Sequence, residues 1–271
     1  MTIWVIMMAP ALTRLRWLMF RFEFELRPLA AVPPWGGDHP RLHWFGLTSG
    51  WYWISAQGYE FLRYSHEAVR TWDLERPYPD YYVARLWEDL IVLRWALQEP
   101  VPEDLISFVD GTFLPREFPV NDDDFGDDVD AAFSFQSDYA LDLGYLTDAP
   151  QLTCWRHAVD GSDVVTLSQQ IPPRKAGTFD GRKRLDVTVP AAELFAAFDN
   201  FDRRFIAAME DRVAELERGP LPAIDLDLQH LRVEHTQRSS WLERRLGSRR
   251  DVDWTKVRAG VAQLRSWPPA R

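Results

Sequence analysis

The sequence predicts an α+β fold in which antiparallel strands pack against several helices. Short segments alternate polar and apolar residues, which is typical of strands with one buried face. Longer segments repeat apolar residues at intervals of three and four, which is typical of helices that bury one side. The two kinds of segment do not alternate regularly, and this favours α+β over a doubly wound parallel sheet. With 271 residues, 46% of them hydrophobic, the chain can bury a core without disulfides.

The most regular strand pattern lies at residues 20–26, where apolar side chains alternate with charged ones. Pro28 ends this run. Three more short strands follow, separated by two dipeptides that each end in a glycine and favour turns, because glycine adopts positive φ without strain. Together these segments predict a β-meander. The strands are expected at 42–48, 51–56 and 59–64, with turns at Ser49-Gly50 and Gln57-Gly58.

A β-hairpin is predicted later in the chain, around the turn sequence Asp160-Gly161-Ser162. Its strands are expected at 152–159 and 164–171, and a further strand at 184–189 follows another Asp-Gly turn.

A long helix is predicted near 190–218, where Pro190 opens the segment and Gly219 ends it. Its apolar residues form one continuous stripe, which fits a helix that faces the core. The stripe consists of Leu194, Phe198, Phe201, Phe205, Met209, Val213 and Leu216. Other helices are expected at 83–97 with Asp80 as N-cap, at 101–109, at 129–143 and over 225–267.

Residues 1–18 are expected to be an extension of the start site or disordered, with a short amphipathic anchor as the alternative. They are apolar, but too short to span a bilayer and interrupted by Arg14 and Arg16. Met19 stands directly before the first strand and is the expected start. Residues 19–271 are then expected to form a single α+β domain.

The charge and the cysteine count restrict the class of protein. The net charge of −10 argues against nucleic acid as a partner. One cysteine, Cys154, excludes internal disulfides and cysteine-based zinc sites, and is expected to be buried in a strand. These features predict a cytoplasmic protein that does not bind membranes. Phosphate-binding loops, the nucleophile elbow and the metalloprotease helix motif are all missing from the sequence, so no cofactor is expected.

An acidic segment at residues 121–130 carries six aspartates. Its glycine and its missing glutamate do not fit a calcium-binding EF-hand loop. No metal is expected there, and the alternative is a looser carboxylate site for a cation. Like charges this close together cannot pack against one another, which predicts a solvated loop leading into a helix. As an exposed surface it would attract a basic protein partner. The aspartates proposed for that contact are Asp122, Asp123, Asp124, Asp127 and Asp128.

A second candidate site lies in the aromatic-rich N-terminal region, within a chain that has 13 tryptophans. Trp and Tyr combine apolar area with a polar group and are frequent at binding sites. The alternative is that these residues simply form the main sheet packed on the long helix. The candidate residues are Trp35, His43, Trp44, Trp51, Trp53 and Arg63.

The N-terminal third resembles a family of bacterial proteins known only as a domain of unknown function. The resemblance lies in the run FEFELRPL at 22–29, in Pro34-Trp35-Gly36 and in LHWFGLTSGWYWI at 42–54. Residues of the long helix, Phe201, Phe205, Met209 and Arg212-Val213, are also similar. The resemblance runs from about Met19 to about residue 240 and implies no assigned activity or catalytic residue.

Two classes of function follow from these observations. The first is a non-enzymatic protein-binding protein, similar to immunity proteins that neutralise a toxin. The second is an enzyme of unfamiliar type, such as a hydrolase, or a binder of small ligands or sugars, using a Trp-rich pocket. The sequence does not determine the oligomeric state.

Overall fold

The computed structural model describes residues 19–114, 116–117, 126–175, 177–219 and 224–269. These residues divide into two compact units. The first unit takes residues within 19–88, 177–180 and 192–244, and the second takes those within 89–176, 181–191 and 245–271. Both units contain helices and antiparallel strands, so the predicted α+β fold is confirmed. One domain over 19–271 stays a prediction, and residues 1–18 lie outside the described chain.

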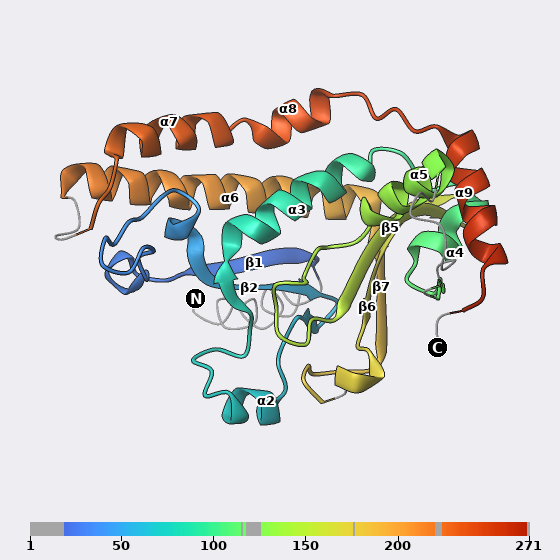
Figure 1. Cartoon of the computed structure of the whole chain (residues 1–271), viewed down its shortest axis with the longest axis horizontal. Coiled ribbons are helices and arrows are strands. Elements are labelled where there is room, and N and C mark those ends of the chain that lie inside the picture. Colours follow the sequence, from blue (N-terminus) through green and yellow to red (C-terminus); the bar gives the residue numbers. More distant parts are fainter. Residues whose placement is uncertain (1–18, 115, 118–125, 176, 220–223, 270–271) are drawn as a thin grey trace, which may run out of the picture. The chain divides into compact units, whose positions relative to one another are not determined.

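The sheet of the first unit is built around β2, which has β1 along one edge (Figure 1). Strands β3 and β4 pair with the other edge of β2. All three pairings are antiparallel. The strands are β1 (Arg21–Leu26), β2 (Ser49–Ala56), β3 (Tyr59–Phe61) and β4 (Asp80–Tyr82), and the short helices of this region are η1 (Leu29–Ala31), η2 (Gly46–Thr48) and α2 (His66–Thr71).

The long helix α6 (Ala191–Arg218) packs its apolar stripe on the inner face of this sheet, as its periodicity predicts. Phe22 of β1 lies 4.7 Å from Phe198, and Phe24 lies 5.5 Å from Phe201, between ring centroids. Full burial of a side chain such as Phe22, Phe198 or Phe201 stabilises the fold by about 1.5–3 kcal/mol.

Arg212 links α6 to the sheet from inside the core. It is 8% exposed, and its guanidinium donates to the backbone carbonyls of Leu47 and Arg27. Burial lowers the pKa of Arg212 to about 10. Arg212 is among the residues that resemble the family, but the sequence does not predict its hydrogen bonds to the two backbone carbonyls.

The strand predicted at 42–48 is wrong, because the segment turns into η2 before β2 begins. The hydroxyl of Thr48 donates to the carbonyl of Phe45 at 2.7 Å, and such local bonds compete with strand pairing. Gly50 consequently lies inside β2 instead of a turn. A Cβ there would stand 2.2 Å from the carbonyl oxygen of Glu25, so glycine is needed for close pairing with β1. The turn at 57–58 is confirmed, with positive φ at both residues.

Asp80 does not cap a helix, which corrects the prediction from the sequence. It belongs to β4, and its carboxylate binds the guanidinium of Arg27. The helix begins three residues later, as α3 (Val83–Ala96), and otherwise occupies the predicted segment.

The second unit contains a three-stranded antiparallel sheet of order β5-β6-β7. The predicted hairpin is confirmed, with positive φ at Asp160 and Gly161 in its turn. Cys154 lies on the apolar face of this sheet at 2% exposure, and burial raises the pKa of its thiol. The strands are β5 (Gln151–Val159), β6 (Ser162–Gln170) and β7 (Arg184–Pro190); η3 (Glu103–Leu105), α4 (Ile106–Val109) and η4 (Pro173–Lys175) are the short helices.

Helix α5 (Gly126–Ser137) starts and ends earlier than the predicted segment 129–143. Asp127 and Asp128 occupy its first turn, where the helix dipole favours carboxylates. After Ser137 the chain leaves the helix because Tyr139 accepts a backbone bond from Cys154 of β5 at 2.8 Å.

The C-terminal region is helical, as predicted, but it is divided into three helices. Aspartates cap two of them: Asp227 accepts from His230 N, and Asp253 accepts from Thr255 and Lys256 N. Figure 1 shows the first of these helices running alongside α6. The helices are α7 (Leu228–Arg238), α8 (Trp241–Gly247) and α9 (Trp254–Ser266). Within the described ranges, no helix is both long and apolar enough to cross a membrane.

Candidate functional site

Trp51 and Trp53 lie on the outer face of the first sheet, and other side chains cover both. The guanidinium of Arg27 stands 4.3 Å from the ring centroid of Trp51, and that of Arg76 stands 5.6 Å from it. Trp53 stacks on Tyr78 with the ring centroids 4.3 Å apart. These rings therefore already have partners within the fold.

Arg63 belongs to the same face and lies in a charged cluster. It binds the carboxylates of Glu60 and Asp180, the latter at 3.2 Å, and the hydroxyl of Tyr78 at 3.3 Å. Burial, followed by the charge of Glu60, raises the pKa of Tyr78 to about 12. A phenol with such a pKa is a poor general base, so the cluster is well suited to a structural role.

Trp44 is fully buried on the other side of the sheet, in the core with α6 and α7. Its indole N–H donates to Nδ1 of His235 at 3.2 Å, and Nε2 of His235 lies 3.0 Å from a carboxylate oxygen of Glu210. These bonds fit a neutral imidazole that carries its proton on Nε2. Arg238 lies 4.4 Å from the centroid of the Trp44 ring.

The free energy of unfolding is expected to fall as the pH drops below about 6.5, partly because of His235. Burial lowers the pKa of His235, against the opposing effect of Glu210, and Arg232 lowers it further. The unfolded chain therefore takes up this proton at a higher pH than the folded protein, and stability is lost as the pH falls.

Urea unfolding at pH 7 and pH 5 checks this expectation on wild type and His235→Gln. The variant should lose less stability between the two pH values. His157, whose pKa burial also lowers, titrates in both proteins and cancels in the comparison. An equal loss in both proteins would contradict the assignment.

Trp35 and His43 form a separate pair near β4. The ring of Trp35 meets that of His43 edge-on at 4.4 Å, and its N–H donates to the hydroxyl of Tyr82 at 2.6 Å. Trp35 is 43% exposed. The six aromatic-region candidates therefore do not converge on one place, and none of them lines the cavity beside β1 that is described below.

The acidic candidates are only partly described. Asp122, Asp123 and Asp124 lie outside the described residues. Asp127 forms an ion pair with Lys256 at 3.0 Å, and this pairing lowers the pKa of the Asp127 carboxyl. Asp128 lies next to it in the first turn of α5. The binding role of this segment stays a prediction.

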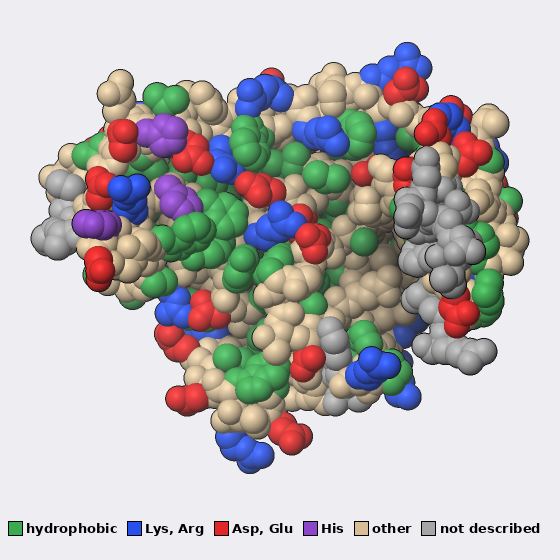
Figure 2. All heavy atoms as spheres, in the orientation of Figure 1, with side chains coloured by type: hydrophobic (Ala, Val, Ile, Leu, Met, Phe, Trp, Pro, Cys, Tyr) green, Lys and Arg blue, Asp and Glu red, His purple; other side chains and the backbone are tan. Residues whose placement is uncertain are grey.

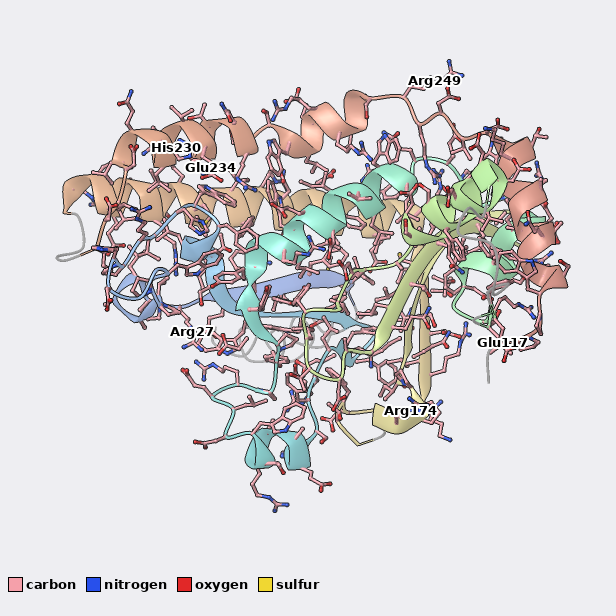
Figure 3. All side chains as sticks on the ribbon, in the orientation of Figure 1. Arg27, Glu117, Arg174, His230, Glu234 and Arg249 are labelled. Atoms are coloured by element: carbon pink, nitrogen blue, oxygen red, sulfur yellow. The ribbon has the colours of Figure 1, made fainter. Side chains whose placement is uncertain are left out.

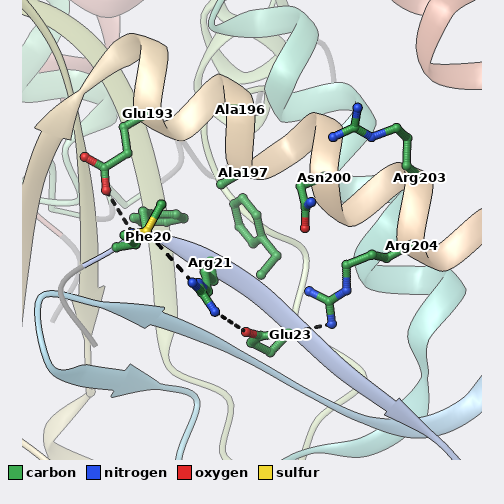
Figure 4. Close-up of a pocket in the computed structure, with 11 residues that line it drawn as sticks. Phe20, Arg21, Glu23, Glu193, Ala196, Ala197, Asn200, Arg203 and Arg204 are labelled. Carbon is green, nitrogen blue, oxygen red and sulfur yellow. Dashed lines mark hydrogen bonds and ion pairs between the residues drawn. The ribbon is translucent and has the colours of Figure 1, made fainter. Parts of the chain in front are cut away.

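A cavity of about 700 Å³ lies beside β1 and the first half of α6 (Figure 4). Residues 19–23 form its strand side. We call this cavity the β1 groove. On the helix side it is lined by Glu193, Ala196, Ala197, Asn200, Arg203 and Arg204.

The backbone of β1 has one edge without a strand partner among the described residues. The N–H of Arg27 donates to the carbonyl of Ser49 at 2.9 Å, which places the odd-numbered residues of β1 in the hydrogen-bonded pairs with β2. The N–H and C=O groups of Phe22 and Phe24 therefore point away from β2, toward the free edge.

The ends of the β1 groove carry opposite charges. At one end, Glu193 accepts a hydrogen bond from the backbone N–H of Phe20 at 2.9 Å. At the other end, Arg204 forms an ion pair with Glu23 at 2.9 Å, and Arg203 is exposed with no ion pair to another described residue. The small side chains of the helix lie between these ends, as Figure 4 shows.

The β1 groove was not predicted from the sequence. Its helix residues recur at intervals of three and four, parallel to the core stripe of α6 but with small and charged side chains. This second stripe was the available signal, but the solvent side of any amphipathic helix has the same spacing.

The part of the chain that the structure describes offers little support for metal binding or for a nucleophilic thiol. No group of three His, Cys, Asp or Glu side chains there is placed to hold a metal ion. The single thiol is buried and its pKa is raised, which disfavours the nucleophilic thiolate.

Comparison with known proteins finds one family. A model described as a family of unknown function (DUF5984) matches residues 21–260. This confirms the resemblance to a domain-of-unknown-function family and extends it past residue 240; a bacterial origin stays a prediction. No curated protein and no solved structure matches the chain.

Proposed function

Since the chain belongs to the family of unknown function DUF5984, we propose from its own geometry that it is a protein-binding protein and that the β1 groove is its contact surface. The observation that carries this proposal is the free edge of β1 beside a cavity of about 700 Å³. Exposed strand edges invite pairing with another chain, and proteins use them for recognition.

The wall of the groove supports a binding role. Ala196 and Ala197 leave room for side chains of a partner, whereas the charged residues at the ends can fix its orientation. None of the lining residues is a Cys, His or Ser that could act as a nucleophile.

The charge of the chain bears on the choice of partner. A net charge of −10 favours the approach of basic proteins, as an immunity-like role requires. On the face drawn in Figure 2, however, acidic and basic side chains are interspersed and form no large field of one sign. The acidic segment at 121–130 is proposed as a further contact with a basic partner, and the cytoplasm as the place where they meet.

The alternative of an enzyme or small-ligand binder has less support. It requires the tryptophans to line a pocket, but Trp51 and Trp53 are covered by their neighbours. Trp44 lies in the core.

Filling the groove is expected to prevent binding. Ala196 is exposed on α6, so Ala196→Trp should place an indole in the groove without disturbing the core. Ala207→Trp is the matched control, because Ala207 is also exposed on α6 but does not line the groove. Tagged full-length wild type and Ala207→Trp should retain the same stoichiometric partner from native cells, and Ala196→Trp should lose it.

The retained partner should then be purified and its Kd measured with each protein. We expect Ala196→Trp to weaken binding at least tenfold while circular dichroism shows an unchanged fold. Equal affinity for Ala196→Trp, or no stoichiometric partner for wild type, would refute the proposal.

A further inference from the structure

We infer that the β1 groove accepts an extended segment of a partner protein, which pairs with the free edge of β1 as an added strand and places an acidic side chain beside Arg203. This inference rests on the proposed function, because it specifies how the partner occupies the groove.

The backbone of β1 favours an extended ligand. Phe22 and Phe24 each turn an N–H and a C=O toward the free edge, and residues two apart on a strand are about 6.6 Å apart. An added strand satisfies these four groups together, because its own donors and acceptors recur at the same spacing. A compact ligand cannot reproduce this repeat.

The strand side of the groove limits how far the pairing extends. The N–H of Phe20 already donates to Glu193 at 2.9 Å. Pairing therefore begins at Phe22 and leaves this end of β1 closed, so the edge provides a short register for one segment and not a continuous sheet.

The walls of the groove determine which side chains fit. Alternate side chains of an added strand point to opposite faces of the sheet. On the face covered by α6 they would meet Ala196 and Ala197, which leave space for residues such as Val or Thr. On the outer face they would lie near Arg21 and Glu23, at the surface of the protein.

The charged residues that line the groove favour an acidic side chain on the bound segment. Arg21, Arg203 and Arg204 line the groove against Glu23 and Glu193, so three cations face two anions. Glu23 is held by Arg204 at 2.9 Å and lies 4.0 Å from Arg21. Arg203 is the remaining cation, with no ion pair to another described residue, and an Asp or Glu on the segment would pair with it.

The probe for the test is a random dodecapeptide library, selected on the full chain and depleted on Ala196→Trp. Wild type should enrich peptides with one Asp or Glu among β-branched residues. Arg203→Glu should reverse the preference to peptides with Lys or Arg, and it should weaken the binding of an acidic peptide at least tenfold. Arg249→Glu, an exposed arginine that does not line the groove, should behave as wild type. An unchanged charge preference in Arg203→Glu would overturn the acidic contact.

Amide hydrogen exchange tests the strand pairing itself. In the free protein, the amides of Glu23 and Glu25 should exchange slowly and those of Phe22 and Phe24 rapidly. A selected peptide should slow the hydrogen exchange of the Phe22 and Phe24 amides at least tenfold. If such a peptide binds and Ala196→Trp blocks it while these two amides stay fast, the proposed function survives but strand addition is wrong.

Two results in the free protein would also overturn the inference. Slow exchange of Phe22 and Phe24 at every protein concentration would mean that this chain covers its own edge. Slow exchange that appears only as the concentration rises would assign the edge to a second copy.

Discussion

Replacing Gly260 by alanine is expected to destabilise the second unit by about 2–4 kcal/mol. Gly260 lies in α9 where this helix crosses α5. A Cβ at this position would stand 1.9 Å from the carbonyl oxygen of Asp128 and 2.9 Å from the Cβ of Ala132. The nearest atom belongs to the backbone, so relief requires α5 and α9 to move apart and lose packing of residues such as Val257.

Gly247→Ala provides the control for this prediction. Gly247 ends α8, and a Cβ there would meet nothing within 4 Å. Alanine should therefore change stability by less than about 0.5 kcal/mol, since its higher helix propensity meets no steric cost. Urea unfolding of the purified full-length proteins gives both values. A Gly260→Ala midpoint equal to that of wild type would show that the helices are not this close.

Gly260 and Gly50 show why the periodicity of a sequence predicts helices and strands better than it predicts the contacts between them. The stripe of α6 and the alternation in β1 are local patterns that burial enforces, and both elements were predicted with nearly correct ends. The close contacts at these glycines join segments far apart in sequence, and no local pattern reports them. The dipeptide Ser49-Gly50 is typical of a turn, yet Gly50 lies inside β2.

The errors at Asp80 and at 42–48 have a related cause. A carboxylate before a helical pattern fits an N-cap, but Arg27, distant in sequence, binds that carboxylate and draws Asp80 into β4. Local hydrogen bonds of the Thr48 hydroxyl replace strand pairing in the second case. In both, a polar side chain found a partner that the sequence does not specify.

The candidate site was predicted less well than the fold, because aromatic residues have many structural uses. Trp44 packs against Trp87 in the core, whereas Trp51 and Trp53, two residues apart on β2, lie on the opposite face and contact different neighbours. The β1 groove instead depends on two small residues, Ala196 and Ala197, whose importance lies in the space they leave. A sequence shows which side chains are present, but the space between elements appears only once they pack.

Arg250 illustrates a polar group whose role depends on tertiary packing. Arg249 and Arg250 are adjacent and look equivalent in the Arg-rich C-terminal sequence. Figure 3 shows Arg249 pointing away from the ribbon, whereas Arg250 is 7% exposed. Its guanidinium donates to the carbonyl of Ala96 at 3.1 Å, to the hydroxyl of Tyr139 at 2.6 Å and to the carboxylate of Asp138 at 3.0 Å.

Arg250→Ala is therefore expected to cost about 3–5 kcal/mol, because it leaves the groups on Tyr139 and Asp138 without their cation inside the second unit. It also removes the guanidinium from the rings of Trp95 and Phe135, whose centroids lie 5.6 and 5.5 Å away.

Arg249→Ala should change stability by less than about 0.5 kcal/mol, because the side chain is exposed. Arg250→Lys should fall between the two, since one ammonium keeps the charge but cannot reach all three acceptors in the geometry of a guanidinium. Urea unfolding of the three variants beside wild type measures these differences. Equal midpoints for Arg249→Ala and Arg250→Ala would mean that the buried bonds of Arg250 contribute no more than solvent contacts do. A fall confined to the Arg250 variants would show that this arginine helps to determine how the segment after α8 packs within its unit.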